Sequence, residues 1–283
     1  MKEHLSKKIV IIYHGDCPDG FGAAWAAWKK FGARAAYIPV AHHDSSPAGL
    51  KNKEIYFLDF VYSANVMAQL MRNNKRVTAI DHHVSAEKVT KMTQDWIYAV
   101  HNSGAVLSWK YFHPKKSVPM LLRCIEDRDI WKWRTKNSKK ILAIIDLFER
   151  KFSVWDKLAK TLENRNVNLD FARKGELLLK HDAMLMQKLL NSADKVKFSG
   201  KIVYALNAPR YFADDLGQVL SRKLSPFAIV WREENGLMRV SLRANGKADV
   251  SKIAKRFGGG GHKNASGFSF PVGRKLPWSL IRK

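Results

Sequence analysis

The sequence predicts an α/β protein of two domains, an N-terminal parallel-sheet domain and a smaller C-terminal mixed α/β domain, with a cleft between them. Three observations predict it. Short apolar runs alternate with helix-length segments early in the chain, as in parallel β-α-β units. A helical pattern at 140–190 and a polar segment at 191–200 then break this alternation, and a shorter array of apolar runs follows. We therefore expect domains at 1–165 and 196–283, joined by a connecting helix and linker at 166–195.

The N-terminal elements follow from apolar periodicity and from turn-forming residues. In chain order they are strand 8–14, helix 21–31, strands 35–40 and 54–58, helix 63–72, strands 76–80 and 95–100, and helices 105–113 and 118–126. Ser103 is a candidate N-cap, and the amide end of the helix that it begins can also approach a phosphate. His42-His43-Asp44 precedes a turn-forming Ser-Ser-Pro-Ala-Gly run, so we expect an exposed loop there.

The C-terminal domain repeats this pattern on a smaller scale. Its expected elements are strand 201–206, helix 212–224, strands 226–232 and 237–243, helix 249–256 and a final strand at 266–270. These elements predict a mixed α/β layer.

Three N-terminal strands end in acids and imidazoles. The residues at these ends are His14, Asp16 and Asp19 after the first strand, Asp59 after another, and Asp81, His82 and His83 after a third. Side chains at the carboxyl end of a strand in an open α/β sheet point into the ligand crevice. One such acid can be a helix N-cap, and an isolated Asp-His-His can be a solvated turn. Three such ends together favour a shared metal site, and Asp with His suits Mn²⁺, Fe²⁺ or Zn²⁺.

A glycine run near the C-terminus predicts a second functional region. Its four consecutive glycines are Gly258, Gly259, Gly260 and Gly261. Such a run is commonly a linker, but here it lies between an expected helix and an expected strand. Glycine permits close backbone approach, which lets amide groups wrap an anion, and His262 and Lys263 add donors. Arg243 ends a strand and can grip a phosphate as a fork, its alternative role being a solvated strand end.

The amino-acid composition indicates which kinds of partner the protein can have. Lys and Arg total 50 against 25 for Asp and Glu, a formal charge of +25, which attracts polyanions. A generally basic proteome is the alternative explanation. Two cysteines, Cys17 and Cys124, give no disulfide framework, and no apolar run is long enough for a membrane span or signal peptide. We expect a cytoplasmic protein without a membrane partner, whose oligomeric state is open, a homodimer being one option.

Two of these motifs carry a family resemblance. Asp81-His82-His83 and the run at 257–268 (Phe-Gly-Gly-Gly-Gly-His-Lys-Asn-Ala-Ser-Gly-Phe) occur in the order found in DHH phosphoesterases with a DHHA1 domain. The chain resembles that family over nearly its whole length. The resemblance implies a two-metal phosphoesterase that uses Mn²⁺, with Mg²⁺ or Co²⁺ as alternatives, on short single-stranded oligonucleotides or nucleotide phosphates. Rival functions are a cyclic-dinucleotide phosphodiesterase, a polyphosphate hydrolase and a non-catalytic nucleic-acid-binding protein.

The resemblance also implies residue roles. The implied metal ligands are His14, Asp16 and Asp19 for one ion, Asp59 as the bridge, and His82 with Asp127 for the other ion. Asp129 is the alternative to Asp127, because helix ends are uncertain by a residue or two.

Further roles concern the substrate. His83 is expected to contact the phosphate or leaving oxygen, and Asp81 to orient a histidine. The implied substrate-binding residues are Arg243, Gly259, Gly260, Gly261 and His262. The chain has His-x-Asp-x-x-Asp-Gly where the family tends to have acid-x-acid-x-Asp-Gly or His-x-x-x-Asp-x-Asp, which leaves the division of roles between Asp16 and Asp19 open.

Overall fold

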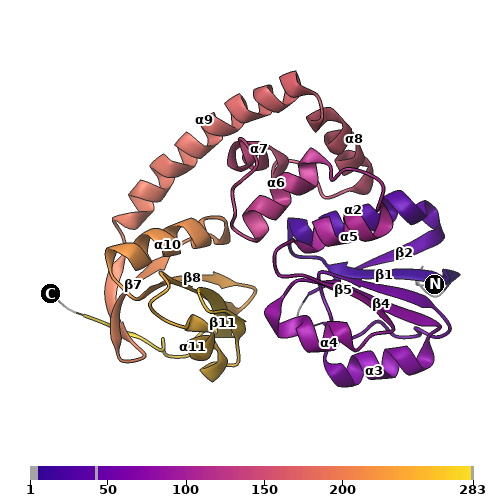
Figure 1. Ribbon diagram of the computed structural model, residues 1–283. Helices are drawn as coiled ribbons and strands as arrows, with labels where there is room; N and C mark the ends of the chain where they lie inside the picture. Colours follow the sequence, from indigo (N-terminus) through magenta and orange to yellow (C-terminus); the bar gives the residue numbers. More distant parts are fainter. Residues whose placement is uncertain (1–5, 42–43, 282–283) are drawn as a thin grey trace. The chain divides into compact units, whose positions relative to one another are not determined.

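The structure, a computed structural model, describes residues 6–41 and 44–281, so His42 and His43 of the expected loop lie outside the described residues. The chain divides into two compact units, Met1–Leu179 and Lys180–Lys283. Each unit contains its own sheet with helices on it, and the predicted α/β fold class is confirmed (Figure 1).

The first unit is built on a sheet that, in the described part of the chain, has five parallel strands. They are β1 (Ile9–His14), β2 (Ala35–Val40), β3 (Glu54–Leu58), β4 (Arg76–Asp81) and β5 (Asp95–Tyr98). Their spatial order is β2-β1-β3-β4-β5. β1, β3 and β4 are therefore neighbours, and their carboxyl ends share one edge of the sheet.

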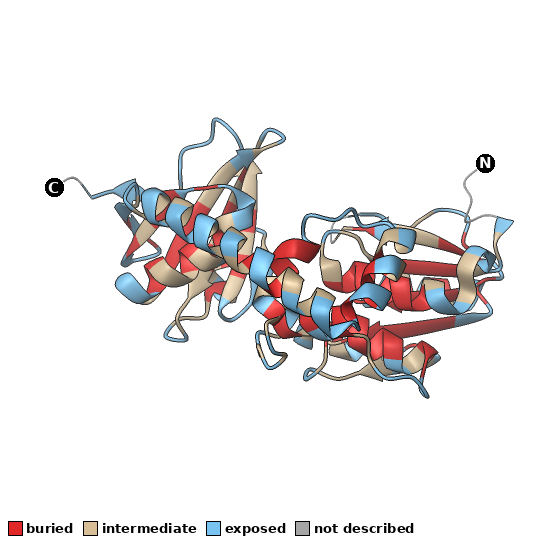
Figure 2. Cartoon of the chain, turned by 90° about the horizontal axis from the view of Figure 1, so that it is seen from above, coloured by how far each residue is buried: buried red, intermediate tan, exposed pale blue. Residues whose placement is uncertain are grey.

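Both faces of this sheet are covered by helices. The helices and short 3-10 turns up to the middle of the unit are α2 (Pro18–Phe31), η1 (Gly32–Arg34), α3 (Ala64–Asn73), η2 (Val84–Ala86), α4 (Glu87–Lys91) and α5 (Gly104–Phe112). In β1, Ile11 and Tyr13 pack toward α2 and α5, whereas Val10 and Ile12 pack toward α3. Figure 2 shows most of the strand surface of this sheet in red, because the central strands β1, β3 and β4 are covered by helices on both faces.

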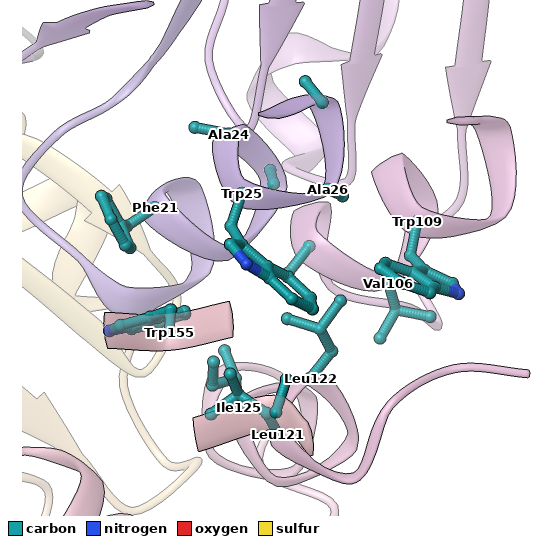
Figure 3. Packing of buried hydrophobic residues seen from close by; sticks show 14 of the residues in the cluster. Phe21, Ala24, Trp25, Ala26, Val106, Trp109, Leu121, Leu122, Ile125 and Trp155 are labelled. Atoms are coloured by element: carbon teal, nitrogen blue, oxygen red, sulfur yellow. The ribbon is translucent and has the colours of Figure 1, made fainter. Parts of the chain in front are cut away.

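The larger core lies on the α2 side and is rich in tryptophan (Figure 3). The Trp25 and Trp109 rings stack with centroids 5.3 Å apart and planes 14° apart. Phe21 packs edge-on against Trp155 at 4.8 Å. Phe21 and Trp25 lie on α2 directly after the predicted metal-binding loop, so this packing fixes the start of that helix against the sheet.

Four further helices complete the first unit and lead into the second. They are α6 (Met120–Asp129), α7 (Ser138–Ile145), α8 (Phe152–Leu162) and α9 (Arg165–Leu190). α6 continues past residue 126, where the sequence predicted its end, and this places Asp129 on the helix. The division between the two units falls within α9.

The second unit has a seven-stranded mixed sheet in its described part, in the order β10-β11-β9-β8-β7-β6-β12. Its elements are β6 (Asp194–Phe198), β7 (Lys201–Asn207), η3 (Arg210–Phe212), α10 (Ala213–Lys223), β8 (Phe227–Glu234), β9 (Leu237–Ala244), α11 (Val250–Arg256), β10 (Gly260–His262), β11 (Ala265–Pro271) and β12 (Ser279–Leu280). α10 packs on one face of the sheet and α11 on the other.

Two segments of the second unit differ from the sequence prediction. The polar stretch at 191–200, expected to contain the boundary between the linker and the second domain, contains β6, whose Val196 and Phe198 are buried in the core. Apolar residues that point into the core alternate there with charged residues that point outward, as in a strand. The interpretation from polar composition did not take this alternation into account. The glycine run contributes Gly260 and Gly261 to β10, so part of it is a strand. Within the described ranges, no helix is long and apolar enough to cross a membrane.

Candidate metal centre

The polar strand ends of the first unit meet at one edge of the sheet. β1 pairs with β3 and β3 with β4 in parallel, with Tyr13 opposite Leu58 and Leu58 opposite Ile80. The next residues along these strands are therefore level with each other, namely His14, Asp59 and Asp81. This is the edge at which open α/β sheets bind ligands.

Asp59 lies at the centre of this edge and is only 1% exposed. Its Oδ2 lies 3.6 Å from His14 Nδ1 and its Oδ1 lies 3.2 Å from His82 Nε2. Its backbone has φ 57°, a left-handed conformation that is uncommon for a residue other than glycine, while its amide donates to Ile80 O at 2.9 Å. The strained turn directs one carboxylate between two imidazoles, so each of its oxygens faces a different set of donors.

One of these sets joins Asp59 with His14 and Cys17. Cys17 is the N-cap residue of α2, and its Sγ accepts a hydrogen bond from Gly20 N at 3.3 Å. The same Sγ lies 3.2 Å from His14 Nδ1 and 3.5 Å from Asp59 Oδ2. Burial raises the pKa of the Cys17 thiol, and the charge of Asp59 raises it further.

The other set surrounds His82. Its Nε2 lies 3.2 Å from Asp59 Oδ1, 3.3 Å from Asp129 Oδ2 and 3.8 Å from Asp19 Oδ2. Asp19, Asp59 and Asp129 thus approach one imidazole from three elements. A cation that replaced the imidazole proton would meet oxygen and nitrogen donors together.

Asp19 is held in place by the N-terminus of α5. Its two carboxylate oxygens accept hydrogen bonds from Gly104 N at 2.7 Å and Ala105 N at 3.1 Å. A Cβ at position 104 would lie 2.7 Å from the Asp59 Cβ and 2.9 Å from Asp19 Oδ2. Glycine is required at this position, because a larger residue would push α5 away from both acids.

The Asp-His-His triplet is organised by its own first residue. Asp81 Oδ1 accepts hydrogen bonds from the backbone amides of His82 at 2.6 Å and His83 at 2.9 Å, and it lies 2.8 Å from His83 Nδ1. Asp81 therefore fixes the direction of the His83 ring. It lies outside the two donor sets that contain Asp59.

The crowding of acids shifts the protonation of the whole cluster. Burial, with the neighbouring charges of Asp129 and Asp59, raises the pKa of Asp19 well above its ordinary value. Burial also raises the pKa of Asp129, to about 6. Burial opposes charge on His82, but the adjacent acids prevail and raise its pKa to about 10. For Asp59 burial favours the neutral acid, yet His14 and His82 outweigh it and hold its pKa below the usual range. The site thus gathers acids that repel one another when ionised, and positive charge nearby, here that of protonated His82, favours their ionised forms.

Three buried atoms at this edge have no hydrogen-bond partner, among the residues that the structure describes. They are Asp59 Oδ1, His82 Nε2 and Asp81 Oδ2. Buried polar atoms without partners are rare in folded proteins. Two of the three, Asp59 Oδ1 and His82 Nε2, form an ion pair across 3.2 Å, a separation that two ligands of one cation can also have. The donor set fits a divalent ion of borderline softness.

Two predicted ligands lie outside the donor sets. Asp16 is exposed on the loop after β1 and belongs to neither set. The Asp127 carboxylate accepts hydrogen bonds from Arg134 N at 3.0 Å and Thr135 N at 2.6 Å, so it fastens the loop after α6. Successive helical residues are about 100° apart, so Asp127 and Asp129 face opposite directions. Asp129, the alternative ligand, is the one that lies beside His82.

Cys17 is a member of the donor sets that was not predicted from the sequence as a ligand, because the two cysteines were considered for disulfide pairing. The signal was present, since Cys17 follows His14 by three residues within the acidic loop.

A cavity of about 280 Å³ adjoins the cluster on the His83 side. Its lining includes Asp59, Asp81 and His83 together with Tyr62 and Val89.

The predicted substrate residues of the second unit come together in their own corner. Along the strand order β10-β11-β9, His262 lies opposite Ala265, and Ala265 opposite Arg243. The Arg243 guanidinium is paired with the Asp214 carboxylate and also donates to Leu242 O at 2.9 Å. Gly261 has φ 132°, and a Cβ there would lie 2.6 Å from Ala265 O, so glycine is needed for this close backbone approach.

Comparison with known proteins identifies the family. Residues 201–277 match the DHHA1 domain model. The chain is 30% identical over 291 residues to the uncharacterized protein R106 of Acanthamoeba polyphaga mimivirus, covering 92% of this chain and 67% of that protein. It is 24% identical over 294 residues to the oligoribonuclease NrnB of Bacillus subtilis (strain 168), covering 91% and 72%.

A solved structure agrees at the level of the fold. RecJ from Thermus thermophilus, in complex with Mn²⁺, superposes with a TM-score of 0.52 at 15% identity, over 95% of this chain and 50% of RecJ. These findings indicate the same family as the parallel sheet with Asp-His-His at a strand end. The chain belongs to the DHH/DHHA1 phosphoesterase family.

Proposed function

We propose that this chain is a phosphoesterase that uses two divalent ions to hydrolyse phosphodiester bonds of short single-stranded oligonucleotides, or the related bonds of nucleotide phosphates. One observation carries the proposal. The buried Asp59 carboxylate offers one oxygen to the His14 and Cys17 set and the other to the His82 set. A carboxylate shared in this way is the natural bridge between two metal ions.

The proposed ligands follow from the two donor sets. One ion would be held by His14, Cys17 and Asp59, and the other by Asp19, Asp59, His82 and Asp129, while His83 also lies close enough to Asp59 and His82 to share a cation with them. When bound, such ions polarise phosphoryl oxygens and lower the pKa of a coordinated water molecule toward neutrality. We propose Mn²⁺, with Mg²⁺ or Co²⁺ as alternatives. Cys17 adds a soft donor that favours Co²⁺ or Zn²⁺ over Mg²⁺ at its own position.

The protein's own side chains orient the substrate around these ions. Asp81 orients the His83 ring, because its Oδ1 lies 2.8 Å from His83 Nδ1. The other ring nitrogen, His83 Nε2, is therefore the one available to the substrate. We propose that His83 hydrogen-bonds a phosphoryl or leaving oxygen. The adjacent cavity of about 280 Å³ gives that oxygen and its neighbours room.

We propose that the second unit binds the nucleotide end of the substrate. Arg243 on β9 and His262 on β10 lie on either side of β11 at one end of its sheet, and Gly259, Gly260 and Gly261 precede His262, with the Gly259 amide donating to Ala254 O at 3.0 Å. Glycine-rich backbone of this kind can cradle an anion. Until substrate binds, the Asp214 carboxylate holds the Arg243 fork in place.

The substrate class is supported by the relatives and by charge. The printed name of the Bacillus subtilis relative is an oligoribonuclease. The formal charge of +25 favours a polyanionic substrate. Together these favour nucleic acid of limited length over a neutral ester.

The test is product analysis on labelled oligonucleotides of two to ten nucleotides, in RNA and DNA form. We expect stepwise shortening with Mn²⁺ and none after chelation, with activity restored by added metal. Hydrolysis that persists unchanged in chelator would contradict the metal requirement. Binding without any cleavage across all lengths and ions would favour the non-catalytic nucleic-acid-binding alternative.

A spectroscopic experiment tests the proposed role of Cys17 without relying on turnover. Co²⁺ bound to a thiolate gives a ligand-to-metal charge-transfer band that oxygen and nitrogen ligands do not give. We expect this band in the wild-type protein and its loss in Cys17→Ser, while Cys124→Ser, which changes the buried cysteine outside the site, retains it. A band that survives Cys17→Ser would remove Cys17 from the ligand set.

A further inference from the structure

The loop that follows α6 is built in an unusual way. This segment, residues 130–137 (the Trp loop), begins at the residue after Asp129. Trp131 has φ 57° and Trp133 has φ 50°, and both values lie in the left-handed region. Large side chains rarely adopt this conformation, and it persists only where surrounding contacts impose it.

Asp127 supplies those contacts. Its carboxylate accepts the amides of Arg134 and Thr135, and its backbone oxygen accepts the amide of Lys132 at 2.9 Å. The acid is itself only 5% exposed. Lys132 Nζ also donates to His101 O at 2.5 Å. The buried Asp127 carboxylate thus stabilises the strained backbone conformation of the Trp loop.

The strained shape presents one indole to solvent. Trp133 is partly buried against the core, and its ring supports Trp131 edge-on, with centroids 5.3 Å apart and planes 73° apart. Trp131 itself is 48% exposed. Trp131 follows Asp129 by two residues, so the Cα atoms of these residues are at most about 7.6 Å apart. The exposed indole is therefore carried by a residue whose backbone lies close to Asp129 of the candidate metal centre, and the Trp133 ring packs against it.

The surroundings of this ring are cationic. Residues 130–140 contain five lysines and arginines and no acid, with Arg134, Lys136 and Lys139 exposed. A protein partner would be expected to meet a broader apolar surface, whereas a single indole within a positive segment matches a nucleobase flanked by phosphates.

We infer that Trp131 is a stacking platform for a nucleobase of the oligonucleotide whose phosphodiester reaches the metal centre, with the cations of the Trp loop contacting neighbouring phosphates. The inference rests on the proposed function and narrows its substrate class. Stacking accepts every base, because each has a π-face. The platform therefore requires a base near the cleaved bond without selecting which base, and it disfavours polyphosphate and base-free diesters.

The test compares a dinucleotide with its doubly abasic analogue, in the sugar form that the wild type hydrolyses faster. Trp131→Ala should lower kcat/KM on the intact dinucleotide by about 5- to 100-fold, the range for loss of one stacked base, and change the abasic substrate less than about twofold. Trp131→Phe, which keeps a flat ring, should recover most of the loss. Trp131→Leu, which keeps apolar bulk without a ring, should not. The Phe and Leu variants decide the matter if the Ala variant fails to fold.

Trp96 provides a matched control. It is 43% exposed on β5 of the same unit and lies in a cationic setting too, with Lys91 Nζ 5.7 Å from its ring centroid. Trp96→Ala should leave kcat/KM unchanged for both substrates. Equal losses in the Trp96 and Trp131 variants, or an equal loss on intact and abasic substrates, would overturn the inference.

A binding experiment separates this inference from the proposed catalysis. In an Asp59→Asn background, fluorescence anisotropy is measured with a labelled tetranucleotide and with its abasic counterpart. Trp131→Ala should weaken binding of the base-bearing strand about 5- to 100-fold and leave the abasic strand unchanged. If no hydrolysis exists, the proposed function fails while this measurement still decides the platform. If hydrolysis exists but Trp131 has no base-dependent effect, only the platform fails.

Discussion

The strand-end cluster of the first unit and the Arg243 corner of the second unit were both predicted from polar residues at strand ends, yet they are built in opposite ways. In the first, Asp59 Oδ1 and His82 Nε2 are buried without hydrogen-bond partners. In the second, the Arg243 guanidinium is paired with Asp214 and backbone oxygens, and two of the four glycines, Gly260 and Gly261, are part of a strand. On the proposed function, cations would complete the first cluster, whereas an anionic ligand would replace the partners that Arg243 has in the second.

The comparison makes Asp59 the position of largest expected effect. Asp59→Ala removes the carboxylate that both donor sets share, so both ions should be lost, and kcat should fall by about a thousandfold or more. The measurement is steady-state hydrolysis together with metal content by elemental analysis. Asp16→Ala, in the exposed acid of the same region, is the matched control and should retain both ions. Near-normal turnover of Asp59→Ala would remove the bridging assignment.

A second prediction separates two acids on one helix. Asp129→Ala should lose one ion and about a hundredfold or more in kcat, because its carboxylate lies 3.3 Å from His82 Nε2. Asp127→Asn should keep both ions, since its carboxylate holds the Trp loop, and should instead raise KM for base-bearing substrates. Metal content and KM, measured on both variants, decide between them. Loss of an ion from Asp127→Asn would restore that residue as the ligand.

These two acids show where prediction from sequence succeeds and where it stops. The meeting of His14, Asp59 and His82 was predictable, because carboxyl ends of adjacent parallel strands share one edge. The choice between Asp127 and Asp129 depended on the end of α6, and a shift of two residues turns a helical side chain to the opposite face. Helix periodicity alone does not fix an end that closely.

Other features depended on tertiary partners that no local pattern contains. The pairing of Arg243 with Asp214 joins positions 29 residues apart, and the amides that hold Asp19 come from α5, 85 residues away. Cys17 was visible in the sequence but acquires meaning only where its Sγ meets His14 and Asp59. The fold class was predictable because it follows from the order of apolar runs, which is a property of the chain itself.

The second unit should affect binding more than chemistry. His262→Ala should raise KM by about tenfold, the loss of roughly one hydrogen bond to a charged group, with little change in kcat and both ions retained. KM for the dinucleotide and metal content are the measurements. Lys201→Ala, an exposed cation on β7 of the same unit, is the control and should behave as wild type. Loss of metal from His262→Ala would place this residue with the first cluster.

The smallest expected effect is on stability without metal, and its sign follows from the protonation of the first cluster. His82 has a pKa of about 10 in the fold against an ordinary value of 6.5, so it contributes stability that is complete below pH 6.5 and is lost as pH rises through about 10. Burial and Asp59 raise the pKa of Cys17, which adds a change of the same sign. In the metal-free protein the melting temperature should therefore fall between pH 6.5 and 10, by a few degrees.

His82→Gln tests the origin of that slope, because glutamine keeps polarity and approximate size without titrating. The variant should show a flatter dependence of the melting temperature over the same pH range. Added Mn²⁺ should also flatten it in the wild type, since metal binding requires neutral His82 and opposes its protonation. The second unit has no comparable cluster among its described residues, so any separate transition from it should not follow this pattern. A slope that is the same in His82→Gln and wild type would show that the acid-imidazole cluster does not control the stability of the metal-free protein.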